Sequence, residues 1–148
     1  MLFEKALVEN RYYTALFIAL CLHPTPATAQ DCGLYQYRAV ITDVYDGDTV
    51  TADIDLGFNT WRHGERLRLY GIDTPEIRTR DDAEKAAGFA ARDKLRELIL
   101  DKEVTLCTLQ DEEGKFGRML AKLYLDDGGP VRYVNAWLVL NGYAEVYE

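Results

Sequence analysis

The chain has few of the residues that build zinc sites or disulfide-rich scaffolds. Its 148 residues include three cysteines and two histidines, and no two cysteines are spaced as in a Cys-x-x-Cys motif. A zinc site of the Cys/His type is therefore nearly excluded, and the fold must depend on a core rather than on many cross-links. With 48% hydrophobic and 28% charged residues, the composition is that of one ordinary folded domain.

Positive charge is also scarce. Seventeen Lys and Arg residues face 25 Asp and Glu residues, which gives a formal net charge of −8. Such a chain does not bind nucleic acid through bulk charge. If it acts on phosphates, a few well-placed arginines and a cation must overcome the negative field.

No hydrophobic run is long enough to cross a bilayer, which takes about 20 residues. The longest apolar stretch, Tyr12–Leu22, precedes Ala27-Thr28-Ala29. This layout predicts a signal peptide over residues 1–29, cleaved after Ala29, and a secreted or periplasmic protein with no membrane anchor after cleavage. An N-terminal core helix or membrane-anchoring helix remains the alternative.

Cleavage would leave Cys32 and Cys107 as the two remaining cysteines. In an oxidising compartment they are candidates for one disulfide bridge. The sequence alone does not show whether their Cα atoms lie within reach, so two free thiols are the other interpretation.

After a short linker at residues 30–36, residues 37–148 predict one mainly β domain with helices. Alternating apolar residues favour strands at 37–45, 49–56, 65–69, 103–109 and 119–125, with a polar loop at 57–64. A helix capped by Asp81 or Asp82 is expected to run to about Leu100, with core-facing residues Ala87, Ala91, Leu95, Leu98 and Ile99. A short helix is expected near Val134–Asn141. This α+β order, with a helix between strands three and four, is that of a five-stranded OB-fold barrel.

Three short stretches carry groups suited to phosphate chemistry. Asp46-Gly47-Asp48-Thr49 lies at a predicted turn, Arg68 to Glu76 ends a predicted strand, and Gly114 to Arg118 precedes another. Each stretch alone is also compatible with an ordinary turn or a solvated strand end. Pro75 keeps Thr74 extended, which can direct the Thr74 carbonyl towards a ligand.

Taken together, these residues predict phosphodiester hydrolysis. Asp48 and Asp73 are hard oxygen ligands suited to Ca²⁺ or Mg²⁺. Arg68 and Arg118 can form forked hydrogen bonds to a phosphate, and Glu76 is the candidate base that directs water. A hard cation and two arginines would neutralise the charge that grows on the phosphate during attack.

These motifs resemble the staphylococcal nuclease (thermonuclease) family over about Tyr37 to Tyr147. They read Asp-Gly-Asp-Thr, Arg-Leu-Tyr-Gly-Ile-Asp-Thr-Pro-Glu and Lys-Phe-Gly-Arg-Met-Leu-Ala. The resemblance implies an OB-fold nuclease that cleaves DNA and RNA with Ca²⁺ and leaves 5′-hydroxyl and 3′-phosphate ends. It implies metal ligands from the carboxylates of Asp48 and Asp73 and the carbonyl of Thr74, a base at Glu76, and phosphate-binding arginines at Arg68 and Arg118.

The resemblance also implies substrate contacts, with some departures from the family pattern. Lys115 matches a lysine that helps hold a terminal phosphate, whereas Phe116 stands where the best-known member has a tyrosine. Tyr143 and Tyr147 are candidates for stacking on substrate, with ordinary packing or surface exposure as the alternative. The sequence given ends at Glu148, without that member's long basic C-terminal helix.

Two other functions remain open at this stage. A non-catalytic nucleic-acid- or protein-binding module of the same fold would need neither the metal ligands nor the arginines. A Ca²⁺-binding structural domain would explain the acidic residues but not Arg68 and Arg118. The expected partners are DNA and RNA substrates, with no stable protein partner and a monomeric state.

Overall fold

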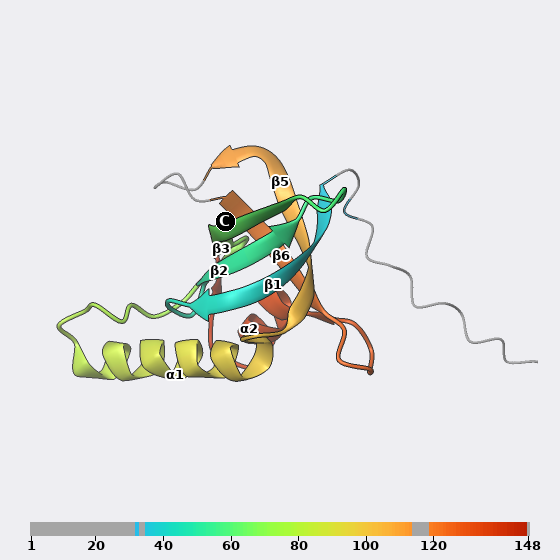
Figure 1. The fold of residues 1–148 in the computed structure, drawn as a ribbon. Coiled ribbons are helices and arrows are strands. Elements are labelled where there is room, and N and C mark those ends of the chain that lie inside the picture. The colour runs from blue at the N-terminus through green and yellow to red at the C-terminus, as the bar shows by residue number, and fades with distance from the viewer. Residues whose placement is uncertain (1–31, 33–34, 114–118, 148) are drawn as a thin grey trace, which may run out of the picture.

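The computed structural model describes residue 32, residues 35–113 and residues 119–147 (Figure 1). The predicted signal peptide at residues 1–29 lies outside the described residues, and so does the predicted substrate loop at residues 114–118. Within the described part of the chain, no helix is both long and apolar enough to span a membrane.

Five strands form a closed barrel. They are β1 (Gln36–Val44), β2 (Thr49–Asp55), β3 (Trp61–Leu69), β5 (Glu103–Glu113) and β6 (Met119–Leu125). Their order is β3-β2-β1-β5-β6, and a parallel pairing of β3 with β6, in which Leu67 faces Met119, closes the ring. This arrangement confirms the predicted OB-fold barrel.

Two helices and three short strands complete the domain. The helices are α1 (Asp82–Ile99) and α2 (Val134–Leu140), and the short strands are β4 (Ile72–Asp73), β7 (Arg132–Tyr133) and β8 (Glu145–Val146). Figure 1 shows α1 lying along one end of the barrel, next to the end of β1. β4 and β8 pair with each other outside the main sheet, which brings the C-terminal segment beside Asp73.

Helix α1 begins after Asp81, one of the two predicted N-cap residues. The Asp81 side chain accepts hydrogen bonds from the backbone N–H groups of Ala83 and Glu84, at 2.8 and 2.9 Å. The predicted core-facing residues Ala91, Leu95 and Ile99 are buried, and Leu98 packs against the core. The expectation for Ala87 was wrong, because Ala87 is exposed while its neighbour Gly88 is buried.

Two strand predictions need correction. The loop expected at 57–64 is shorter, because β3 begins at Trp61 and pairs with β2 from that residue on. The strict alternation expected in the first strand is interrupted by a shift in register between Ile41 and Asp43. Because of this irregularity, Val44 is buried together with Ile41, although strict alternation would place the two on opposite faces.

Two further contacts tie the barrel together. Cys32 and Cys107 form a disulfide with a Cα–Cα distance of 5.7 Å, so the bridge rather than two free thiols is what the structure contains. Buried Asn135 accepts a hydrogen bond from the Leu123 N–H and donates to the carbonyls of Tyr70 and Ala121. These bonds link α2 and β6 to the segment that follows β3.

Candidate active site at the end of β3

The turn between β1 and β2 packs tightly against the segment that follows β4. The Tyr45 N–H donates to the Thr49 carbonyl at 2.9 Å, and the Asp48 N–H donates to the Asp46 carboxylate at 3.1 Å. A Cβ atom at Gly47 would lie 2.8 Å from side-chain atoms of Thr74. Glycine is therefore needed here for close approach, and it lets Asp48 reach Thr74.

Asp48 is the most enclosed carboxylate in this region, with 3% of its surface exposed. Its Oδ1 accepts hydrogen bonds from Arg68 Nη1 at 2.7 Å and from the Thr49 hydroxyl at 3.1 Å. Its Oδ2 accepts from the Thr74 N–H and the Thr74 hydroxyl, both at 3.3 Å. The carboxylate is thus held in one orientation from both sides.

Arg68 joins the two carboxylates that the sequence singled out. Besides the Asp48 contact, its Nη2 lies 2.6 Å from Oδ1 of Asp73, a residue that is largely exposed. One guanidinium therefore contacts an oxygen of each carboxylate, so the two carboxylates converge. The sequence predicted these residues as metal ligands and a phosphate-binding arginine, but it did not predict that they form one ion-pair network.

Burial raises the pKa of the Asp48 carboxyl to about 6. That pKa already includes a smaller upward contribution from the negative charge of Asp46 and downward contributions from the Arg68 guanidinium and the Thr49 hydroxyl. The site therefore concentrates negative charge beyond what one arginine balances. Its oxygen donors suit a hard divalent cation, which would favour the ionised form of Asp48.

Glu76 is exposed and lies on the segment between β4 and α1. Helix α1 packs closely against the backbone of this segment. A Cβ at Gly88 would lie 2.6 Å from the Pro75 carbonyl oxygen and 3.0 Å from the Glu76 carbonyl carbon. The closeness of this contact requires glycine at position 88. The Glu76 side chain is thus carried on a backbone held between α1 and the Thr74 contacts.

Three predicted residues, Lys115, Phe116 and Arg118, lie outside the described residues. The strand that follows them starts at Met119, which pairs with Leu67, and Leu120 pairs with Arg68. The chain therefore enters β6 beside the strand that carries Arg68.

The two candidate stacking tyrosines have different surroundings. Tyr143 is partly buried and stacks on Trp137, with ring centroids 6.1 Å apart, which is an ordinary packing role. Tyr147 is largely exposed, and its N–H donates to the Gly71 carbonyl at 3.1 Å, beside the β4–β8 pair that contains Asp73. Of the two tyrosines, Tyr147 is thus the one whose backbone is bonded to the segment that leads into Asp73.

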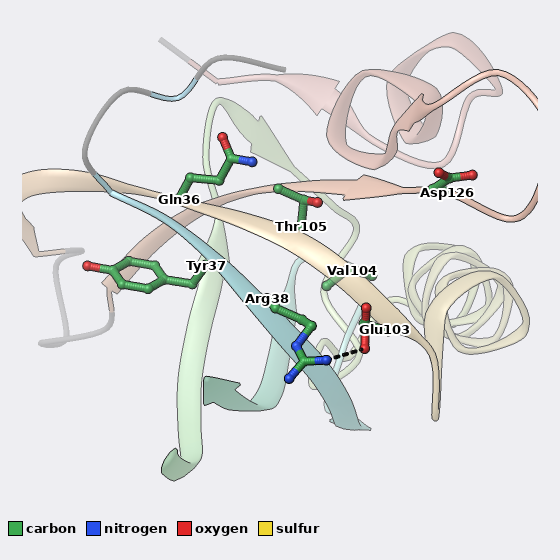
Figure 2. Close-up of a pocket in the computed structure, with 7 residues that line it drawn as sticks. All are labelled: Gln36, Tyr37, Arg38, Glu103, Val104, Thr105 and Asp126. Carbon is green, nitrogen blue, oxygen red and sulfur yellow. Dashed lines mark ion pairs between the residues drawn. The ribbon is translucent and has the colours of Figure 1, made fainter. Parts of the chain in front are cut away.

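A surface pocket lies elsewhere, over β1 and the start of β5 (Figure 2). Its arginine, Arg38, is already paired with Asp55 at 2.6 Å and with Glu103 at 3.6 Å. None of the predicted site residues lines this pocket. Asp48, Arg68 and Asp73 thus meet at the turn and strand end, not in this pocket.

Residues 66–148 match the family model described as Staphylococcal nuclease homologue. The chain belongs to this family. Two relatives support the assignment. Thermonuclease of Staphylococcus intermedius is 32% identical over 88 residues, which cover 60% of this chain and 49% of that protein. The protein named Uncharacterized protein MJ1439, of Methanocaldococcus jannaschii, is 26% identical over 129 residues, covering 75% of this chain and 59% of its own length.

The chain therefore spans about half to three fifths of these curated relatives. Arg68 and Asp73 lie within the matched residues 66–148, whereas Asp48 precedes them. Two further positions support the site in this member of the family, and sequence reasoning did not identify them as such. They are Gly47 and Gly88, whose need for glycine follows from contacts made far along the chain. The Asp-Gly-Asp-Thr motif indicated a turn at Gly47 but not its contact with Thr74, and no local sequence signal marks Gly88.

Proposed function

We propose that this protein is a Ca²⁺-dependent nuclease that hydrolyses phosphodiester bonds of DNA and RNA and leaves 5′-hydroxyl and 3′-phosphate ends. The observation that supports this most is the convergence of the Asp48 and Asp73 carboxylates on Arg68, beside the segment that carries Glu76. Family membership supports a nuclease-type activity.

The donor set fits a hard cation. The carboxylates of Asp48 and Asp73 and the carbonyl of Thr74 would hold Ca²⁺, with waters and a substrate phosphate completing its shell. Among the described residues, no group of three or more His, Cys, Asp and Glu side chains is arranged to hold a metal. Bound Ca²⁺ would act as a Lewis acid on the phosphate oxygens. With only two carboxylate ligands, metal binding is expected to be loose and to tighten with substrate.

The protein residues then have separate tasks. Glu76, exposed to solvent, accepts a proton from the attacking water and directs the water oxygen towards phosphorus. The new bond from this oxygen to phosphorus forms as the bond between phosphorus and the 5′-oxygen breaks, and the leaving 5′-oxygen takes a proton from solvent. Arg68 uses one N–H for each carboxylate and keeps its remaining donors for a phosphate oxygen. Arg118 is proposed as the second phosphate-binding arginine, and it would stabilise the charge that develops during attack.

Several related expectations belong to the same proposal. Lys115, Phe116 and Tyr147 would contact the substrate, while Tyr143 supports the barrel through Trp137. The protein is proposed to act as a monomer after export and cleavage of residues 1–29. Mass spectrometry of protein made in a secretion-competent bacterial host tests the last point, since the mature chain should begin at Gln30.

Degradation of plasmid DNA by the purified protein tests the activity. Wild-type protein should degrade the plasmid in Ca²⁺ and not in EGTA, and Glu76→Gln should degrade it far more slowly in Ca²⁺. DNA binding without degradation in Ca²⁺ would instead support a non-catalytic binding module.

A further inference from the structure

Two arginines share one tyrosine ring next to the proposed active site. The Arg66 guanidinium carbon lies 4.3 Å from the centroid of the Tyr45 ring, and that of Arg78 lies 5.2 Å from it. The three residues come from separate segments. Arg66 lies on β3, Arg78 follows Glu76, and Tyr45 is the first residue of the β1–β2 connection. The fold therefore gathers two positive charges at one place on a protein whose formal net charge is −8.

Among the described side chains, neither of these two charges has a carboxylate partner. Within residues 35–109 and 119–147, most arginines contact an acidic side chain, as Arg62 contacts Glu65 at 2.6 Å and Arg92 contacts Asp93 at 2.7 Å. No such ion pair involves Arg66 or Arg78 in this part of the chain, although acidic residues outnumber basic ones. Within this part of the chain the two like charges thus have no balancing carboxylate, and a bound anion would relieve their repulsion.

The tyrosine ring also orders the two guanidinium groups. An arginine over an aromatic face gains attraction from the ring while its N–H edges stay free for hydrogen bonds. Arg66 and Arg78 are both exposed, and Tyr45 is half-buried, so the N–H donors are accessible to a ligand. A phosphate, with its several acceptor oxygens, is the anion that suits such forked donors.

The cluster lies on the same side of the barrel wall as the candidate active site. Leu67 and Leu69 point into the core, so Arg66 and Arg68 project from the opposite face of β3. Two residues along a strand are separated by about 6.6 Å. Arg78 follows Glu76 by two residues, and Arg66 precedes Arg68 by two. Both arginines of the cluster are therefore close in sequence to residues assigned to catalysis. A strand of nucleic acid bound at Arg68 would therefore pass close to the cluster.

We propose that Arg66 and Arg78, ordered by Tyr45, form a subsite for a backbone phosphate of the nucleic-acid strand next to the one that is cleaved. This inference rests on the proposed nuclease function and extends it. The subsite binds substrate and takes no part in bond breaking. The subsite provides local electrostatic attraction for a polyanion, which the negative net charge of the protein does not provide.

The matched comparison uses two double variants. Arg66→Gln/Arg78→Gln removes the cluster, while Arg62→Gln/Arg92→Gln removes the same total charge from arginines that already have carboxylate partners. Arg92 also lies over an aromatic ring, at 4.7 Å from the Phe89 centroid, which makes it a close control. The substrates are a short single-stranded DNA and a dinucleotide with one phosphodiester bond.

The cluster variant should raise KM for the single-stranded DNA about tenfold relative to the control, with kcat unchanged. The dinucleotide, which has no second phosphate, should show no difference between the variants. The slope of log KM against log salt should decrease by about 0.7, as expected for one lost phosphate contact. Equal changes on both substrates, or equal effects of the two double variants, would overturn the subsite.

Equilibrium binding separates this inference from the nuclease proposal. Anisotropy of the labelled single-stranded DNA is measured in EGTA, where hydrolysis does not occur. Weaker binding by the cluster variant than by the control supports the subsite even if the wild-type protein cleaves nothing. Equal binding overturns it even if the wild-type protein is an active nuclease.

Variants of Tyr45 give a second, independent readout. Tyr45→Phe keeps the ring and should retain wild-type DNA binding, whereas Tyr45→Leu should weaken binding in the same way as loss of the arginines. Phosphatidylglycerol vesicles test the other polyanion class. If the cluster variant loses binding to vesicles while DNA binding stays unchanged, the arginines serve a membrane and the nucleic-acid subsite is wrong.

Discussion

The two ends of the β2–β3 hairpin carry similar ion pairs in opposite environments. At the end next to the β1–β2 turn, buried Asp48 contacts Arg68. Towards the hairpin tip, Asp53 contacts His63 at 2.8 Å and Asp55 contacts Arg38 at 2.6 Å, on a more exposed surface. Burial raises the pKa of Asp48, whereas hydrogen bonds from His63 and Arg38 lower the pKa of Asp53 and Asp55 respectively.

This difference shows that burial, and not the type of partner, determines whether the pKa of the carboxyl is raised or lowered. A side-chain hydrogen bond stabilises the carboxylate in each case, but at Asp48 the loss of water outweighs it. A buried carboxylate with excess negative charge around it is suited to bind a cation. A solvated carboxylate with its own partner is an ordinary surface ion pair.

The largest difference in kcat is expected between a variant of the proposed base and a variant at the hairpin tip. Glu76→Gln keeps the shape of the side chain but cannot accept the proton from water, so kcat should fall by about 10²–10⁴-fold. His63→Gln, at the tip, should leave kcat unchanged. Initial rates on plasmid DNA in saturating Ca²⁺ measure both. Wild-type turnover in Glu76→Gln would show that the base has been assigned wrongly.

The next effect concerns the contact between α1 and the Glu76 segment. Gly88→Ala places a Cβ against the Pro75 carbonyl and must shift the backbone that carries Glu76. Because a misplacement of about 1 Å can cost about 10²-fold, kcat should fall by about ten- to a hundredfold. The exposed neighbour gives the control, since Ala87→Ser touches none of these groups. Unchanged kcat in Gly88→Ala would mean that the segment adjusts without moving Glu76.

Calcium should stabilise the protein through one end of the hairpin only. In excess Ca²⁺ the wild-type protein should gain about 1–3 kcal/mol over EGTA, for a ten- to hundredfold excess over Kd. Asp48→Asn removes a charged ligand and should abolish this gain, whereas Asp53→Asn should keep it. Thermal unfolding with and without Ca²⁺ measures the difference. Equal stabilisation of both variants by Ca²⁺ would show that Asp48 does not bind the metal.

The smallest effect is a pH dependence at the tip. The Asp53 pKa is lowered in the folded protein, first by His63 and then by the Gly64 N–H. Asp53 therefore contributes stability above its unfolded pKa of about 4, and this contribution is lost as pH falls through the lower folded value. Asp53→Asn should flatten the fall in melting temperature below about pH 4. An unchanged profile would show that the pair contributes nothing measurable.

Much of the fold follows from sequence pattern, and the exceptions have identifiable causes. Apolar alternation and the Asp81 cap gave the order of strands and the start of α1 correctly. The interruption in β1 was missed because one extra residue changes which face later residues occupy, and nothing in the local pattern marks it. The early start of β3 was missed because its first residues are exposed and show no apolar alternation. Their strand conformation depends on pairing with β2.

The candidate site was predicted in part for a similar reason. Asp48, Arg68 and Asp73 belong to short motifs whose residue types indicate phosphate chemistry, and the structure brings these three together. Gly47, Gly88 and the Tyr45 cluster depend on contacts between distant segments, which one sequence does not reveal. The roles of Lys115, Phe116 and Arg118 remain predictions, since these residues lie outside the described part of the chain.

End-group analysis of cleavage products tests the central claim most directly. Single-stranded DNA is incubated with the purified protein in Ca²⁺ and, separately, in EGTA, and the product ends are identified by enzymatic labelling and mass spectrometry. The account predicts 5′-hydroxyl and 3′-phosphate ends that form only in Ca²⁺. Products with 5′-phosphate ends, or the same products in EGTA, would contradict it.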